Sequence, residues 1–154
     1  MSIQDNFRFA MRRYIYSVSI MSNRDDGGNT NAITVSSVTS ISMEPPSLLI
    51  CINKSSRIHD TLTIGSKFCI NLLNKDQEKL SNTCSDEDKH EQRFNDKNWN
   101  LEDIPFLGNA QANIFCKVDK LSSYHTHTIV VGLVEDAHFS DNISTLTYVD
   151  GEYR

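Results

Sequence analysis

Hydroxyl side chains are concentrated in one short stretch of predicted β structure. They occupy most positions from 34 to 40: Thr34, Ser36, Ser37, Thr39 and Ser40. Because side chains alternate along a strand, Thr34, Ser36 and Ser40 are expected on one face, unless a bend brings Ser36 and Ser37 together. Hydroxyls and backbone N–H groups suit a flat heteroaromatic ring that is rich in hydrogen-bond acceptors. A solvent-facing strand rich in serine and threonine is the alternative interpretation.

A second polar cluster follows the next expected strand and precedes a short expected helix. Its residues are Asn53, Lys54, Ser55, Ser56 and Arg57. The amino terminus of a helix presents free N–H groups and a partial positive charge, which suits a phosphate. An ordinary serine N-cap with solvated basic neighbours is the alternative. The two clusters together, joined by one strand, are typical of a mononucleotide or flavin pocket.

Two histidines lie close together before a later strand, in Tyr124-His125-Thr126-His127. In an extended strand, His125 and His127 would face the same side. No carboxylate or cysteine lies at a helpful spacing, so the sequence predicts no metal site. A hydrogen-bonding or proton-handling role for His127 at a pocket rim competes with that of a surface histidine.

Several common cofactor and catalytic motifs do not occur. The sequence has no GxGxxG after its first expected strand and no GxxxxGK[ST] phosphate loop. It also has no HExxH and no GxSxG. Dinucleotide binding of the Rossmann type and serine hydrolase chemistry of the α/β type therefore find no support.

Composition limits the class of protein. The 154 residues are 38% hydrophobic and 23% charged, with a net charge of −5. This predicts one folded domain over residues 1–154, with no membrane span and no nucleic-acid partner. The first six residues lack a basic start and an apolar run, so no signal peptide is expected. The four cysteines are widely spaced and mostly in apolar stretches, which predicts free thiols and a cytoplasmic location.

The expected elements are mostly strands. We expect strands at 13–20, 32–42, 47–52, 67–73, 110–118, 128–134 and 143–149, with turns at 25–29 and Pro45-Pro46. The apolar run 47–52 predicts a strand buried on both faces. Short helices are expected at 57–62 and 76–80, and a loop or lid with aromatic anchors at 85–100. The fold class is therefore mainly β, an antiparallel, Greek-key-like barrel with a few short helices.

With these elements in place, the sequence resembles the short-chain flavin reductases of the FMN-binding split-barrel superfamily. These proteins supply reduced flavin to partner monooxygenases. The resemblance covers nearly the whole chain, and its motifs occur in the family's order. The matching segments include 31–37, 40–42, 45–46, 49–56, 68–73, 93–94, 127–129, 132–134 and the closing Tyr148-Val149-Asp150-Gly151-Glu152-Tyr153.

The resemblance implies a site for a flavin, which is FMN or FAD. It also implies NADH or NADPH as the hydride donor. His127 would lie on the nicotinamide side as the catalytic residue. The implied flavin contacts are Thr34, Val35, Ser36, Ser37, Ser40, Cys51, Asn53, Lys54, Ser55, Ser56, Arg57, Tyr148 and Tyr153. A homodimer and a partner monooxygenase are implied as well. Many members carry Gly-Asp before the histidine, whereas this chain has His125-Thr126.

Three alternatives remain open from the sequence. The chain could be a flavoprotein that holds FMN and reduces another acceptor, a flavin-binding protein without reductase turnover, or an unrelated structural β-barrel protein. FMN cannot be distinguished from FAD, because both carry the same ring and first phosphate. NADH cannot be distinguished from NADPH without a residue placed to contact the ribose 2′ group.

Overall fold

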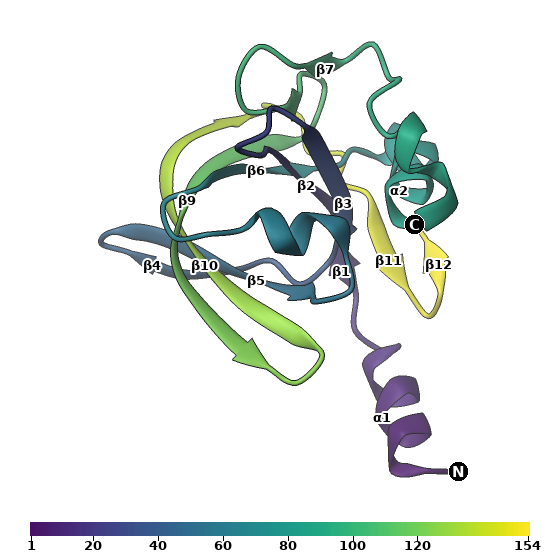
Figure 1. Cartoon of the computed structure of the whole chain (residues 1–154). Helices are drawn as coiled ribbons and strands as arrows, with labels where there is room; N and C mark the ends of the chain where they lie inside the picture. The colour runs from purple at the N-terminus through teal and green to yellow at the C-terminus, as the bar shows by residue number, and fades with distance from the viewer.

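The computed structural model describes all 154 residues, and antiparallel strands make up most of it (Figure 1). One sheet of seven strands has the order β3-β2-β6-β9-β10-β5-β4. The strands, in that order, are Thr30–Val35, Ser19–Arg24, Lys67–Leu72, Ala112–Tyr124, His127–Phe139, Pro46–Asn53 and Thr39–Met43. Strands β3 and β4 are consecutive in the chain yet lie at opposite ends of the sheet. Because only residues 36–38 join them, the sheet must curl into a barrel, which confirms the predicted fold class.

Smaller elements flank the barrel. A three-stranded sheet contains β1 (Tyr16–Ser17), β11 (Thr147–Val149) and β12 (Glu152–Tyr153), and β7 (Trp99–Asn100) pairs with β8 (Phe106–Leu107). The α-helices are α1 (Ile3–Met11) and α2 (Glu78–Ser85), and the 3-10 helices are η1 (Arg57–Thr61), η2 (Lys75–Gln77) and η3 (Glu87–Gln92). None of these helices has the length and apolar character that crossing a membrane requires.

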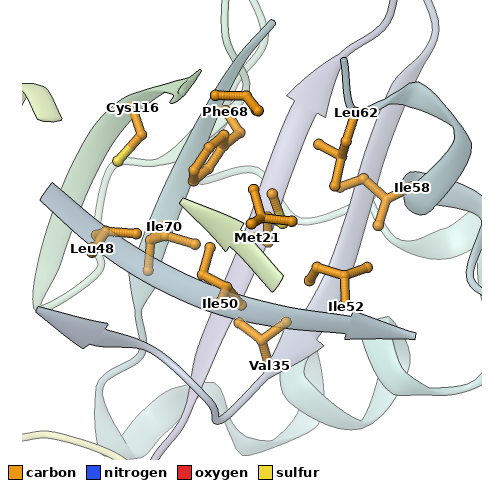
Figure 2. Close-up of a cluster of buried hydrophobic side chains, with 12 residues drawn as sticks. Met21, Val35, Leu48, Ile50, Ile52, Ile58, Leu62, Phe68, Ile70 and Cys116 are labelled. Atoms are coloured by element: carbon orange, nitrogen blue, oxygen red, sulfur yellow. The ribbon is translucent and has the colours of Figure 1, made fainter. Parts of the chain in front are cut away.

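The barrel interior holds the larger of two apolar clusters (Figure 2). Leu48, Ile50 and Ile52 from β5 are buried there, and Ile58 and Leu62 from the η1 region lie in the same cluster. A second cluster fills the space between the sheet and α2 and includes Leu80, Trp99 and Leu146. Burial of this apolar surface is the main force that holds the curled sheet in shape.

Four expected strands differ from those observed. The stretch 13–20 contains β1 and only the first two residues of β2, with Val18 between them, and 32–42 forms β3 and β4 with a break at residues 36–38. Of the expected strand 143–149, only Thr147–Val149 (β11) is a strand. The prediction that 47–52 is buried on both faces is wrong. Burial alternates along β5, because its outer face, with Leu49 and Cys51, is only partly covered.

The first helix, α1, was not expected from the sequence. Ser2 and Asp5 form a capping box at its start, and Ile3, Phe7 and Met11 recur at helical spacing. No residue of α1 is buried, and the helix stands away from the barrel (Figure 1). Hydrogen bonds between Arg12 and the backbone of Asp150 tie its carboxyl end to the turn between β11 and β12.

The remaining predictions agree better with the structure. The hairpin turn at 25–29 and strand 67–73 are confirmed, as are short helices at 57–62 and 76–80, the latter capped by Asn74. Strands β9 and β10 are longer than expected, with 13 residues each. The polar segment 85–100 contains η3, and Trp99 anchors it by donating from Nε1 to the carbonyl of Arg93 at 2.9 Å.

All four cysteines are free thiols. Cys69, Cys84 and Cys116 are buried, and Cys51 is partly exposed on the outer face of β5. Burial raises the pKa of Cys84 and of Cys116 to about 12 each, and it raises the pKa of Cys69 further still. The three buried thiols therefore behave as small apolar side chains rather than as nucleophiles.

Candidate functional site

The hydroxyl-rich segment lies at the end of β3, where the chain leaves one edge of the sheet. Thr34 fixes this edge to α2 by donating from Oγ1 to the carbonyl of Ser81 at 2.6 Å. Beside it is a cavity of about 360 Å³. The cavity is lined by Val18, Thr34, Val35, Ser36, Asn82, Ser85, Tyr148, Gly151 and Tyr153.

This cavity brings together residues from distant parts of the sequence. Thr34, Val35 and Ser36 line it together with Tyr148 and Tyr153, which the family resemblance also implied as flavin contacts. The tyrosine rings make an edge contact with centroids 5.2 Å apart. The Tyr153 hydroxyl shares a 2.8 Å hydrogen bond with Ser81 Oγ and lies 3.1 Å from Asn82 Oδ1. Packing and hydrogen bonds thus hold the cavity wall in one arrangement.

Asn82 and Ser85 were missed by the sequence analysis. Both belong to α2 and are three residues apart, so they lie on the same side of that helix. The helical region that carries them could be predicted from the sequence, because Asn74 caps its start and fixes where the helix begins. The observation that would have connected them to Thr34 is the packing of α2 on β3, which only the structure provides.

Ser37 closes the gap between the two edges of the sheet. Its Oγ accepts a hydrogen bond from the Cys51 backbone N–H at 3.1 Å and donates to the Cys51 carbonyl at 3.3 Å. The break at residues 36–38 is therefore the bend that brings the hydroxyl segment to β5. Ser40 is not part of this arrangement, because it lies exposed on β4 opposite Leu48 and makes no side-chain hydrogen bond.

The second polar cluster is a tight turn after β5. Asn53 Oδ1 accepts hydrogen bonds from the backbone N–H and the hydroxyl of Ser55, both at 2.9 Å. Lys54 Nζ reaches across to Ser123 Oγ on β9 at 2.5 Å. Ser56 is buried and donates to the Asn53 carbonyl at 2.7 Å, so its hydroxyl is already engaged.

The helix expected to supply a phosphate site is too short for that role. η1 is a single 3-10 helix of five residues, and Ser56 makes no side-chain cap bond there. The helix dipole grows with aligned peptide units, so a five-residue helix contributes little. Any anion bound at this turn must depend on the exposed side chains of Lys54, Ser55 and Arg57.

His127 is the first residue of β10 and lies directly opposite Asn53 in the register. Its Nδ1 makes a 2.8 Å hydrogen bond with Thr126 Oγ1, which orients the ring. His125 does not share its face, contrary to the sequence expectation. It lies in the hairpin turn with a φ of 49°, so the alternation of a strand does not apply there.

These contacts place one continuous set of side chains on the outer face of the barrel. Cys51 and Asn53 point outward from β5, and Ile129 and His127 lie opposite them on β10. Ser37 adjoins Cys51, and the Lys54–Arg57 turn follows Asn53 directly. The apolar strip of Cys51 and Ile129 can cover a planar ring. The hydroxyls of Thr34 and Ser37 already donate within the protein, so Ser36 is the hydroxyl of this segment that can donate to a ring. The basic turn can bind an anion.

Comparison with known proteins identifies the family of this chain. A family model described as "Flavin reductase like domain" matches residues 11–154. The reductase component of the FADH(2)-dependent resorcinol hydroxylase of Rhizobium sp. (strain MTP-10005) is 35% identical over 98% of this chain and 86% of its own length. The FMN reductase (NADH) RutF of Pantoea ananatis is 32% identical over 97% of this chain and 80% of its own.

A solved structure shows the same architecture. The styrene monooxygenase flavin reductase of Pseudomonas putida S12 superposes with a TM-score of 0.82 at 27% identity. The match covers 97% of this chain and 96% of that one. The agreement includes the strands that carry the candidate site, because almost the entire chain is aligned.

Proposed function

Because the chain belongs to the flavin reductase-like family, we propose that it transfers a hydride from NADH to FMN or FAD and supplies the reduced flavin to a partner monooxygenase. The observation that carries the proposal is the link between Ser37 and Cys51. That link joins a hydroxyl-rich segment to the strand that ends in the basic turn. The names of the two relatives support NADH as donor and a hydroxylase as recipient.

The residues present fit a flavin in two respects. The ring needs a hydrogen-bond donor at its edge and an apolar surface below, which the Ser36 hydroxyl and the strip of Cys51 and Ile129 offer. The nucleotide phosphate needs positive charge and hydroxyls, which Lys54, Ser55 and Arg57 offer in a protein of net charge −5. When bound, the flavin accepts at N5 the hydride that the nicotinamide gives from C4.

The chain's own contribution is orientation and exclusion of water. No side chain has to move a proton for the hydride to transfer, so catalysis depends on the distance between donor and acceptor. We assign His127 to the nicotinamide, because it stands at the rim of the same face with its Nδ1 already oriented by Thr126. Asn53, directly opposite His127, lies between the nicotinamide side and the phosphate turn.

We propose further that the whole chain acts as one domain in the cytoplasm and forms a homodimer. The four free thiols fit a reducing compartment. Large apolar side chains remain exposed on α1 and β4, with Phe7 66% and Met43 78% exposed. A second copy of the chain would cover such surfaces.

The direct test is NADH oxidation by purified protein, with and without added flavin. We expect the rate to rise and saturate with free FMN or FAD, because the flavin is then a substrate. A constant rate without added flavin, in a yellow protein that reduces another acceptor, would indicate the flavoprotein alternative. Flavin binding without any NADH oxidation would refute the proposed reaction.

A further inference from the structure

The hairpin of β11 and β12 separates two cavities. On one side is the cavity of about 360 Å³ beside Thr34 and Ser36. On the other side, against α1, is a cavity of about 460 Å³. Tyr148 and Gly151 line both cavities, so the hairpin is their common wall. The contacts that fix this hairpin therefore also determine the shape of the candidate flavin cavity.

Asp150 and Gly151 form the two-residue turn of this hairpin. Their φ angles are 52° and 85°, so both residues have left-handed backbone conformations. Two consecutive residues with positive φ are typical of a type I′ turn, which favours asparagine, aspartate and glycine. The paired strands have only three and two residues, so their ladder alone restrains the hairpin weakly.

The carboxyl end of α1 holds this turn through Asp150 (Figure 1). Arg12 Nε lies 3.1 Å from Asp150 Oδ1, and Arg12 Nη2 donates to the Asp150 carbonyl at 2.9 Å. Arg13 Nη1 donates to the same carboxylate oxygen at 3.4 Å, and the Asp150 backbone N–H donates to the Arg12 carbonyl at 3.1 Å. A Cβ added at Gly151 would lie 2.5 Å from Arg12 Nη2, so the guanidinium rests directly against the turn.

The two tyrosines of the hairpin are held in different ways. The Tyr153 hydroxyl is fixed by its hydrogen bonds with Ser81 and Asn82. The Tyr148 hydroxyl forms no hydrogen bond within the chain, and the Tyr148 ring makes only an edge contact with that of Tyr153. Because Tyr148 lies two residues before Asp150, the position of its ring depends on the backbone of the turn.

We propose that Asp150 is a positioning residue for flavin binding. Its contacts with Arg12 and Arg13 fix the turn, so that Tyr148 forms a rigid wall of the candidate flavin cavity. The inference rests on the proposed function and deepens it, because it gives the end of α1 a part in shaping that cavity. Asp150 does not line the cavity itself and acts through Tyr148.

The contacts between Asp150 and the two arginines should weaken as the salt concentration rises. The side chains of Arg12 and Asp150 are 42% and 59% exposed, and that of Arg13 is 70% exposed. Salt screens the attraction between exposed charges. Riboflavin is the suitable probe of this effect, because it has no phosphate whose own charge would make binding depend on salt.

The test compares riboflavin binding by the wild type and by Asp150→Asn, using fluorescence titration. Asparagine accepts the left-handed conformation of the turn but lacks the negative charge. At about 0.02 M salt we expect the Kd for riboflavin to be about threefold to fivefold higher in Asp150→Asn. At about 0.5 M salt the two Kd values should nearly coincide, because the ion pairs of the wild type are then screened.

Glu152→Gln is the matched control. It removes a carboxylate from the same hairpin and changes the net charge equally, but Glu152 pairs only with Arg154, at 3.5 Å. This variant should bind riboflavin as the wild type does. Thermal unfolding checks that each variant is folded.

Tyr148→Ala, alone and combined with Asp150→Asn, tests whether Asp150 acts through the tyrosine. If it does, Asp150→Asn should cause no further loss of riboflavin affinity once the Tyr148 ring is absent. Additive losses, an unchanged Kd in Asp150→Asn, or an equal loss in Glu152→Gln would overturn the proposal.

These titrations do not require NADH, so the two proposals can fail separately. If the wild type binds riboflavin and Asp150→Asn binds it equally well, only the role of Asp150 is refuted. If the wild type binds no flavin at all, FMN included, the proposed function is refuted and the role of Asp150 with it.

Discussion

The two faces of β5 and β10 share one hydrogen-bonded ladder but have opposite environments. On the inner face, Ile50 and Val130 are completely buried. On the outer face, Cys51 and Ile129, which are paired in the register, remain partly exposed. The residue types on both faces are apolar, so hydrophobicity alone does not account for the difference.

The difference shows how one strand serves both stability and binding. The inner face packs against β2, β6 and β9 and determines the curvature of the barrel. The outer face has no covering layer in the monomer. It is bordered by polar side chains that can bind a ligand, those of Ser37, Asn53 and His127. Substitutions on the two faces should therefore affect different measurements.

The largest expected effect is on stability, from Ile50→Ala. Removing a fully buried side chain leaves a cavity, which should lower the free energy of unfolding by about 2–5 kcal/mol. Leu49→Ala, at the neighbouring outward position, should cost about 1 kcal/mol or less. Urea denaturation measures both. Similar losses in the two variants would abolish the distinction between the faces.

Gly132→Ala should destabilise by overpacking rather than by loss of contacts. An added Cβ would lie 2.7 Å from Phe68 Cζ and 3.1 Å from Cys116 Cβ inside the barrel. We expect a loss of about 1–3 kcal/mol, measured by thermal unfolding. Gly108→Ala is the control, because its new Cβ would meet no atom closer than 3.6 Å. An unchanged Tm for Gly132→Ala would mean that the interior is more tolerant than its packing indicates.

On the outer side, Ser55→Ala should weaken FMN binding about tenfold and leave riboflavin binding nearly unchanged. The Ser55 hydroxyl is exposed beside Lys54, and only FMN carries a phosphate for it to contact. Fluorescence titration with both flavins measures the difference. If both affinities fall by the same factor, the turn after β5 does not bind the phosphate.

His127→Ala should raise the KM for NADH about threefold to tenfold while flavin affinity stays nearly the same. The expected cause is the loss of one hydrogen-bonding group at the rim of the site. Initial rates at varied NADH and saturating flavin provide the measurement. If flavin affinity falls sharply while the dependence on NADH stays normal, His127 contacts the flavin rather than the nicotinamide.

The smallest effect concerns reactivity rather than energy. At pH 8 a thiol with a pKa of about 12, as burial gives Cys84 and Cys116, has roughly one thiolate in ten thousand. Cys51 should therefore react first with Ellman's reagent in the native chain, and bound flavin should slow that reaction. Equally fast labelling of Cys116 would show that the inner face opens readily.

The strand pattern was readable from the sequence because alternation and turn residues act locally. The turn at 25–29 and strand 67–73 followed directly from them. The break at residues 36–38 was not fixed by local pattern, since the hydroxyls favour a strand throughout and only the contact of Ser37 with β5 bends the chain. The same reason explains the outer face of β5, whose apolar residues indicated complete burial although nothing in the monomer covers them.

The candidate site was partly readable. The family resemblance implied that Thr34–Ser36, Tyr148 and Tyr153 contact one flavin, and the structure has all of them lining one cavity. Asn82 and Ser85 were missed because their relation to β3 arises from the packing of α2 on that strand. Ser40 was grouped with the others by sequence proximity, yet the break sends it to the opposite edge of the sheet.

The three residues that join β3 to β4 also set a geometric limit. A chain advances at most about 3.3–3.6 Å per residue, so the four steps from Val35 to Thr39 span at most about 14 Å. Residues 36–38 thus limit how far apart the two end strands of the sheet can lie. An inserted residue would let β3 and β4 separate further, and a deleted one would draw them together, so the length of this connection sets how tightly the sheet curls.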